Sequence, residues 1–260
     1  MISVLVNIQP DGGHEARLQA AIALVSRLGG HISCVQTMSA MAAPADASAD
    51  ASEVEYLAVV HREAIDFQET VEAGLAAADV EWTWLRSYGD PATILVERSL
   101  MADLIILSAD ESFPPISSVA LSSQAPILVA PSPDAHFIPD QSALVAWNGS
   151  RPAARATRGA LPLLQSMEPV HILSVDGDSN ISPASLAREY LSHHRIKSDV
   201  HRRSSDGHNV ADTIINMARE LGSGLIVAGA FGHNRLREML LGSVTRELLK
   251  NSPLPLLLAH

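Results

Sequence analysis

Short apolar segments alternate with longer amphipathic segments along the whole chain. Residues 2–8 and 143–147 are each followed by a short polar loop and then by an alanine-rich segment with helical spacing. This alternation is typical of β-α-β units and predicts parallel sheets covered by helices. The runs at 104–107 and 224–229 are apolar almost without a break, which indicates central strands buried on both faces.

The same order of elements occurs in both halves of the chain. Each half is predicted to hold five strands alternating with four helices, and each ends in a proline-led apolar strand, at 125–131 and 254–260. The segment between the halves, 130–142, has three prolines and shows neither helical nor strand periodicity. We therefore interpret it as a linker. We therefore predict two tandem α/β domains, 1–132 and 141–260. Pairing of their proline-led strands would cover two otherwise exposed sheet edges.

Residues 39–53 fall outside the repeat. They are rich in Ala, Ser and Asp and lead into a long amphipathic segment at 54–77. We predict a mobile loop followed by a helix, with a lid over a site as the alternative.

Composition limits the cellular compartments in which the protein is expected. The hydrophobic content of 47% supports a sizeable core, and no apolar run approaches the ~20 residues of a membrane helix. The start of the chain does not resemble a secretory signal, and the single cysteine, Cys34, is expected to be a buried hydrophobe on a strand. These features predict a cytoplasmic protein without disulfides.

Charge is unevenly spread. Up to residue 137 the chain has five arginines and no lysine against 18 acidic residues, a net charge of −13, whereas the remainder carries 13 basic and 11 acidic residues, a net +2. A total of −11 makes nucleic acid an unsuitable partner, since a phosphate backbone requires a basic face. An anionic small ligand would prefer the second half.

The segment 229–244, GAFGHNRLREMLLGSV, carries the most specific pattern. Gly229 closes an apolar strand, and Gly242 with Ser243 opens a helix whose free N–H groups attract anions. This spacing favours a phosphate cradle, with a flexible turn as the alternative. Ser243 could cap the helix or give its hydroxyl to a phosphate. Neither a Walker loop nor a dinucleotide fingerprint is present in the sequence.

Side chains near this segment suggest further contacts. If the first and fourth strands of the second half are neighbours, Asn148 faces Gly229 across the crevice, where its amide could bond a base or ribose, or simply form a turn. His233, Arg235 and Arg237 could reach a phosphate or lie on the surface.

No candidate catalytic or metal site stands out in the sequence. The adjacent His193 and His194 cannot share one helix face, so they are interpreted as a solvated helix end and not as metal ligands. No pairing of a nucleophile with a base is evident, and no residue is assigned a catalytic role.

The glycine pattern inside a repeated five-strand unit resembles the universal stress protein family, here as a tandem pair. The resemblance covers essentially all 260 residues and is stronger over 141–260. It implies, in each domain, a Rossmann-like or flavodoxin-like parallel sheet of order 3-2-1-4-5 with helices on both faces. It also implies that ATP binds with a divalent metal such as Mg²⁺ or Mn²⁺. Carried over by position, the phosphate site comprises Gly229, Gly232, Gly242, Ser243 and Val244, and the nucleoside contacts are Ala146, Asn148 and Val175.

The chain departs from the family pattern at two places. The family commonly has an aspartate at the position of Asn148, and we interpret Asn7 as its equivalent in the first half. Ser108 aligns with Gly229, and the loop after it is four residues shorter and carries Asp110 and Glu111, which would repel a triphosphate. We therefore predict that nucleotide binds only to the second half and that the first half is a structural partner.

Three functional hypotheses remain open from the sequence. The first is an ATP-binding stress-response or signalling module, which could also form a homodimer. The second is an interaction scaffold that no longer binds nucleotide. The third is a slow ATP hydrolase or phosphotransferase.

Overall fold

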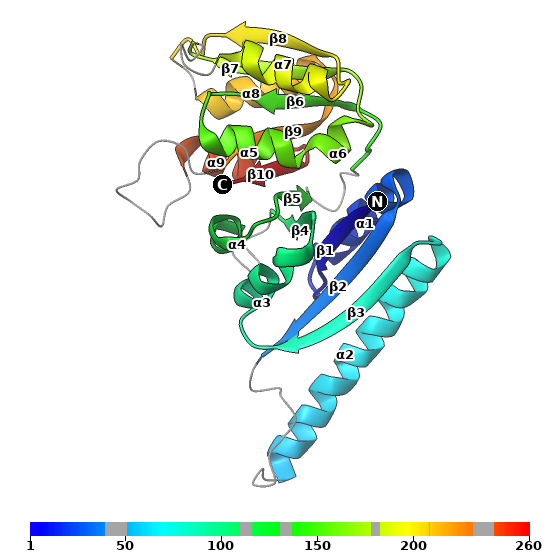
Figure 1. The fold of residues 1–260 in the computed structure, drawn as a ribbon. Helices are drawn as coiled ribbons and strands as arrows, with labels where there is room; N and C mark the ends of the chain where they lie inside the picture. Colours follow the sequence, from blue (N-terminus) through cyan, green and yellow to red (C-terminus); the bar gives the residue numbers. More distant parts are fainter. Residues whose placement is uncertain (40–50, 110–115, 131–136, 178–182, 208, 231–241) are drawn as a thin grey trace.

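The computed structural model describes residues 1–39, 51–109, 116–130, 137–177, 183–207, 209–230 and 242–260 (Figure 1). Within these residues strands and helices alternate along both halves of the chain, as the apolar pattern predicts. None of the helices in this described part is long and apolar enough to span a membrane.

The first half contains five strands and four α-helices within its described residues, together with a 3₁₀ turn at Ser99–Met101. In chain order these are β1 (Ile2–Asn7), α1 (His14–Leu28), β2 (Gly30–Met38), α2 (Ala51–Ala77), β3 (Glu81–Tyr88), α3 (Pro91–Arg98), β4 (Leu104–Ser108), α4 (Ile116–Ser122) and β5 (Ile127–Ala130).

The second half repeats this order with one difference. Its elements are β6 (Ser142–Ala146), α5 (Arg151–Gly159), α6 (Leu161–Leu164), β7 (Val170–Val175), α7 (Ala184–His193), β8 (Ser198–Arg203), α8 (Val210–Glu220), β9 (Ser223–Gly229), α9 (Ser243–Asn251) and β10 (Leu256–Ala259). The single helix predicted after the first strand is divided into α5 and α6. Pro162 has no N–H to bond to the carbonyl of Arg158, so the regular helical ladder is interrupted there.

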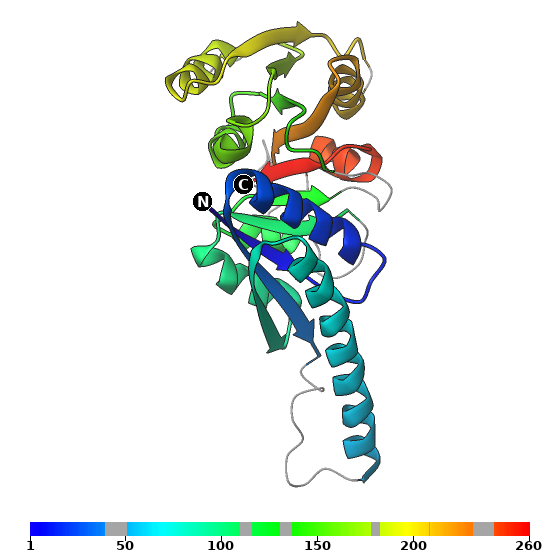
Figure 2. The same ribbon diagram turned by 90° about the vertical axis from the view of Figure 1, so that its right-hand side faces the viewer.

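All ten strands of the described chain form one sheet, in the order β3-β2-β1-β4-β5-β10-β9-β6-β7-β8. Each half therefore has the order 3-2-1-4-5 with parallel neighbours, which confirms the predicted fold class. In both views the sheet continues through the middle of the molecule, with β5 and β10 at its centre (Figures 1 and 2).

The predicted pairing of the two proline-led strands is present. β5 and β10 run antiparallel, with Leu256 opposite Val129, Leu257 opposite Leu128 and Leu258 opposite Ile127. All of these side chains are buried, so the two halves are joined through apolar packing as well as through backbone hydrogen bonds.

Helices cover both faces of this sheet, and each face has its own apolar layer. One layer includes Val4, Leu24 and Leu257 and contains residues of α1, α5 and α7. The other contains residues of α3, α4, α8 and α9, among them Ile214 and Leu248. Because both layers contain residues from the two halves, the core is continuous across the junction.

Turn chemistry explains where several helices begin. Asp90 caps α3 by accepting hydrogen bonds from the backbone N–H of Thr93 at 2.8 Å and from its hydroxyl at 2.7 Å. These bonds hold the pKa of the Asp90 carboxyl below its usual range. Asn209 caps α8 through Ala211 N–H at 2.9 Å. A Gly-Asp turn precedes α3 and an Asp-Gly turn precedes α8, each with its glycine at positive φ.

Cys34 lies on β2 and is fully buried, as the sequence predicts. Burial, together with the nearby negative charge of Glu72, raises the pKa of the thiol to about 12. We expect the folded protein to resist a thiol-specific disulfide reagent at pH 8, because the reactive thiolate is almost absent. The same reagent should label one thiol per chain in urea, and fast labelling of the folded protein would contradict this burial.

Candidate functional site

A pocket opens at the carboxyl ends of the strands in the second half, between β6 and β9. It has a volume of about 300 Å³. This value is at the lower end of the range for small-molecule sites. Its position is the point at which the strand order reverses, where open α/β sheets bind their ligands. Seven of the eight residues predicted from the sequence line it: Ala146, Asn148, Val175, Gly229, Gly242, Ser243 and Val244. The eighth, Gly232, lies outside the described residues.

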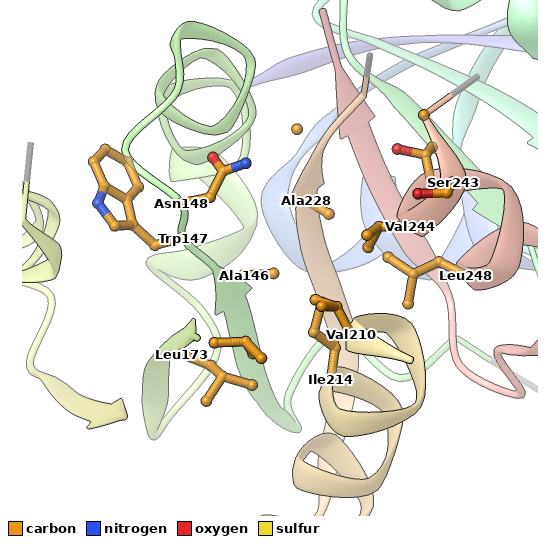
Figure 3. A pocket seen from close by; sticks show the side chains of 14 residues that line it. Ala146, Trp147, Asn148, Leu173, Val210, Ile214, Ala228, Ser243, Val244 and Leu248 are labelled. Atoms are coloured by element: carbon orange, nitrogen blue, oxygen red, sulfur yellow. The ribbon is translucent and has the colours of Figure 1, made fainter. Parts of the chain in front are cut away.

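The floor of the pocket is apolar. Ala146 from β6 forms one side, and Val210 and Ile214 from α8 form another (Figure 3). Val175 of β7 also lines the pocket. Leu248 of α9 completes this surface. No carboxylate, lysine, arginine or histidine is among the described lining residues, so the floor suits an uncharged, flat, apolar group such as a base.

Two polar side chains lie at the rim. Asn148 and Ser243 are placed on opposite sides of the pocket, on the loop after β6 and at the start of α9 (Figure 3). Gly242 is the N-cap residue of α9 and Ser243 is its first helical residue, so Ser243 does not cap the helix as one of the sequence interpretations allowed. The first intrahelical bond runs from Arg246 N–H to Gly242 O at 3.0 Å. The N–H groups before it are therefore available to an anion, and the first turn has no acidic residue to compete.

Asn148 uses part of its side chain to shape the loop. Its Oδ1 accepts a hydrogen bond from Ser150 N–H at 3.1 Å, and the intervening Gly149 has a φ of 74°. Ser150 in turn caps α5 by accepting from Ala153 N–H at 3.3 Å. The turn role considered for Asn148 is thus present, while its Nδ2 and the second lone pair of Oδ1 remain suitable for a ligand.

Gly229 has a packing role in addition to its place in the motif. A Cβ on this residue would collide with the backbone nitrogen of Ala153 and lie 2.7 Å from the carbonyl carbon of Pro152. The first turn of α5 therefore approaches the end of β9 more closely than any side chain allows. This glycine is required by the fold even without a ligand.

Several lining residues were not predicted from the sequence. These are Trp147, Leu173, Val210, Ile214, Ala228, Thr245 and Leu248. Val210 and Ile214 are four residues apart at the start of α8, and this spacing was a usable signal for one helix face. Trp147 follows Ala146 directly, but its indole points away from the pocket (Figure 3) and packs in the opposite apolar layer.

The strand register corrects one sequence alignment. Ile8 N–H bonds to Val35 O on β2, and Trp147 N–H bonds to Leu173 O on β7, so Ile8 and Trp147 are equivalent. It follows that Asn7 corresponds to Ala146 and Gln9 to Asn148, and that the predicted equivalence of Asn7 and Asn148 is wrong. The alignment of Ser108 with Gly229 agrees with the register, since Ser108 pairs with Ala130 and Gly229 with Ala259.

The corresponding place in the first half has different chemistry. Asn7 stands where the second half has Ala146, and by the same register Thr37 stands where it has Val175. Gln9 Nε2 donates a hydrogen bond to the Thr37 hydroxyl, so polar side chains bond to each other at this place. The apolar floor of the second-half pocket is therefore not reproduced in the first half.

A buried arginine holds this end of the first half together. Arg17 of α1 is only 1% exposed. Its Nε donates to Asn7 O at 2.6 Å, its second terminal nitrogen forms an ion pair with Asp11 at 2.8 Å, and its first bonds to the Ser108 hydroxyl. The guanidinium thereby joins the ends of β1 and β4 to the loop before α1. Arg17 is the fourth residue after the N-cap of α1, and the fourth residue after the N-cap of α5 in the second half is Ala154.

Other predicted residues fall outside the described part or away from the pocket. Gly232, His233, Arg235 and Arg237 of the second half, and Asp110 and Glu111 of the first, lie outside the described residues, as does most of the predicted loop at 39–53. His193 ends α7 and His194 follows as its C-cap residue. Within the described residues no group of three or more His, Cys, Asp or Glu side chains is arranged to hold a metal ion.

Comparison with known proteins supports the fold. Residues 141–260 match the model of the Universal stress protein family. The chain is similar in structure to a universal stress protein from Archaeoglobus fulgidus DSM 4304, with 18% identity, a TM-score of 0.74 and coverage of 99% of this chain and 96% of that one. A functionally unknown protein from Pseudomonas aeruginosa PAO1 is also similar, with 16% identity, a TM-score of 0.60 and coverage of 100% and 92%. None of the curated protein sequences matches the chain.

Proposed function

We propose that this chain, whose residues 141–260 match the Universal stress protein family model, binds ATP in the pocket of its second half. We further propose that it acts as a cytoplasmic stress-response or signalling module. The observation that carries the proposal is the convergence of seven residues, chosen from the sequence alone, on one pocket at the strand-order reversal.

The chemistry of the lining fits the parts of a nucleotide. The apolar floor between Ala146, Val175 and Ile214 suits a base, and Asn148 at the rim offers donors and an acceptor to the base or ribose. The N-terminus of α9, with Gly242 and Ser243, suits phosphate oxygens. Since the described lining has no carboxylate, a divalent metal such as Mg²⁺ would be held mainly by the phosphates, and the Ser243 hydroxyl would be a candidate protein ligand.

The first half would serve as a structural partner. Its Asn7, Gln9 and Thr37 replace the apolar floor, and its Arg17 places a paired guanidinium at the end of β4. We propose that residues 1–132 and 141–260 act as a pseudo-symmetric pair of domains. In this arrangement nucleotide binds to the second domain alone, and the first supplies the strand that covers the edge of β10.

Isothermal titration with ATP and Mg²⁺ tests the proposal. We expect one site per chain in the wild type and at least a tenfold weaker affinity in Ala146→Phe, because the new ring fills the pocket floor. Ala76→Phe is the matched control, since Ala76 is exposed on α2 and far from the pocket in sequence and fold. Far-ultraviolet circular dichroism checks that each variant is folded. Equal affinities in the wild type and Ala146→Phe would contradict binding in this pocket.

A second candidate function is an interaction scaffold without bound nucleotide. Two observations favour it: Gly229 is already required by the close approach of α5, and Asn148 already shapes a turn. In that case neither the wild type nor Ala146→Phe would give a heat of binding with ATP. Nucleotide found by mass spectrometry in the purified protein would exclude the scaffold function.

The third hypothesis, slow ATP hydrolysis, has less support, because no described lining residue can act as a general base. If the wild type releases phosphate from ATP no faster than a Ser243→Ala variant does, the hydrolysis hypothesis is contradicted.

A further inference from the structure

A second concave surface lies at the other end of the strands, where α7 ends and β8 begins. This groove has a volume of about 770 Å³ and is lined by residues of α7 and of the turn after it. Arg188, Arg195 and Lys197 contribute three exposed cations, against Glu189 as the one acidic residue of its described lining. Within the described residues none of the three cations forms an ion pair. The groove therefore presents uncompensated positive charge.

Two local features define the polar chemistry of the groove. Ser198 contributes a hydroxyl whose oxygen is buried and has no hydrogen-bond partner. Arg195 has a φ of 63°, a conformation uncommon for a residue with a side chain. Bonds from Arg195 N–H to Ser192 O at 2.9 Å and from Ile196 N–H to Leu191 O at 3.0 Å hold this turn. These two bonds form an ordinary C-terminal turn of α7, and this turn places Arg195 at the groove.

The opposite end of the molecule carries a surface of complementary chemistry. Helix α2 projects beyond the sheet in both views, whereas α7 and β8 lie at the far end of the molecule (Figures 1 and 2). Segment 51–77 has six acidic residues against Arg62 as its one arginine. Its buried side is a narrow stripe that includes Leu57, Ala64 and Leu75, so most of the helix surface is exposed.

One exposed face of α2 combines apolar and acidic side chains. Tyr56 and Val59 are 63% and 51% exposed, and Glu63 and Asp66 follow at helical spacing on the same face and are also exposed. A helix face of this kind is unusual for a surface that contacts only water, because large apolar side chains are exposed together. It suits a groove that offers cations to the carboxylates.

We propose that α2 of one copy of the chain docks in the α7–β8 groove of a second copy. Glu63 and Asp66 would face Arg188, Arg195 and Lys197, and Tyr56 and Val59 would be covered. The charge asymmetry of the chain, −13 in the first half and +2 in the second, favours such contact between unlike halves. Since the two surfaces lie at opposite ends, two antiparallel copies make the contact twice and form a closed dimer. This inference is independent of nucleotide binding.

Sedimentation velocity on the full chain tests the dimer. We expect a concentration-dependent dimer at about 0.05 M NaCl and a dissociation constant at least tenfold higher at about 0.5 M, because salt screens contacts between exposed charges. A wild type that stays monomeric at low salt, or a dimer indifferent to salt, would overturn the proposal. Binding of polyglutamate to a monomeric wild type would assign the groove to another acidic partner and would overturn it as well.

Charge reversal tests the two surfaces separately. Variant A carries Glu63→Lys and Asp66→Lys, and variant B carries Arg188→Glu and Lys197→Glu. Each alone should weaken dimerisation at least about tenfold through like-charge contact, whereas an equimolar mixture of A and B should dimerise again, since both contacts regain opposite charges. The control, Glu97→Lys with Arg98→Glu on exposed α3, should dimerise as the wild type does. Absence of dimer in the mixture would overturn the pairing of α2 with this groove.

Discussion

Replacing Arg17 with methionine is expected to lower the free energy of unfolding by about 3 kcal/mol. The change keeps an apolar stem but removes the guanidinium that binds Asn7 O, Ser108 and Asp11. It leaves the Asp11 carboxylate, only 20% exposed, without its cation, and it leaves the Asn7 carbonyl without its donor. Urea denaturation followed by circular dichroism measures the loss.

Two further variants show whether the loss comes from the buried pair. Arg27 forms an ion pair with Asp140 in which both side chains are at least half exposed, so Arg27→Met should cost less than about 1 kcal/mol. Adding Asp11→Asn to Arg17→Met should recover part of the stability, because no unpaired carboxylate remains. Similar losses for Arg17→Met and Arg27→Met would contradict the role assigned to burial. ATP affinity in folded Arg17→Met should not change, since Arg17 does not line the second-half pocket.

The buried arginine also illustrates what the sequence could not predict. Charged side chains are almost never fully buried, so Arg17 in an amphipathic helix is read as a surface residue by default. Only the fold brings its guanidinium to the ends of β1 and β4, and Ser108 is 91 residues away in the chain. The sequence contains no local signal for such a contact.

The misaligned asparagine has a different cause. Asn7 and Asn148 each follow an apolar strand and precede a polar loop, but the loop before α1 spans residues 8–13 and that before α5 spans 147–150. The true equivalent of Asn148, Gln9, is two residues after Asn7. A shift of two residues keeps every side chain on the same sheet face, so the apolar pattern cannot detect it.

The features that the sequence predicted correctly are those that follow from the order of strands and helices along the chain. The alternation of strands and helices, repeated in both halves, identified the fold, and the carboxyl ends of neighbouring strands placed Asn148 and Gly229 together. Val210 and Ile214 of α8 were missed because apolar residues on an amphipathic helix are usually core. Whether they pack in the core or line a cavity depends on the tilt of α8 against α9, which the local sequence does not determine.

Replacing Gly229 with alanine is expected to lower the free energy of unfolding by about 1–3 kcal/mol in protein free of nucleotide. A single Cβ would meet the backbone of Pro152 and Ala153, which cannot turn aside as a flexible side chain can. Gly12 is the matched control, since a Cβ there has no neighbour within 4 Å and its φ is not positive. Gly12→Ala should therefore change the stability by less than about 0.5 kcal/mol. Equal stability of both variants would contradict the close approach of α5.

The clash expected in Gly229→Ala determines which glycine substitution can test for contact with a phosphate. To relieve the clash in Gly229→Ala, α5 must shift, and Ser150 and Asn148 shift with it, so ATP affinity falls whether or not Gly229 lies against a phosphate. Gly242 has an ordinary φ of −53° and only caps α9, so Gly242→Ala adds no backbone strain. A tenfold loss of ATP affinity in Gly242→Ala, with stability within about 1 kcal/mol of the wild type, would therefore indicate that the ligand approaches the main chain there. An unchanged ATP affinity in Gly242→Ala would contradict binding of the phosphates at the N-terminus of α9.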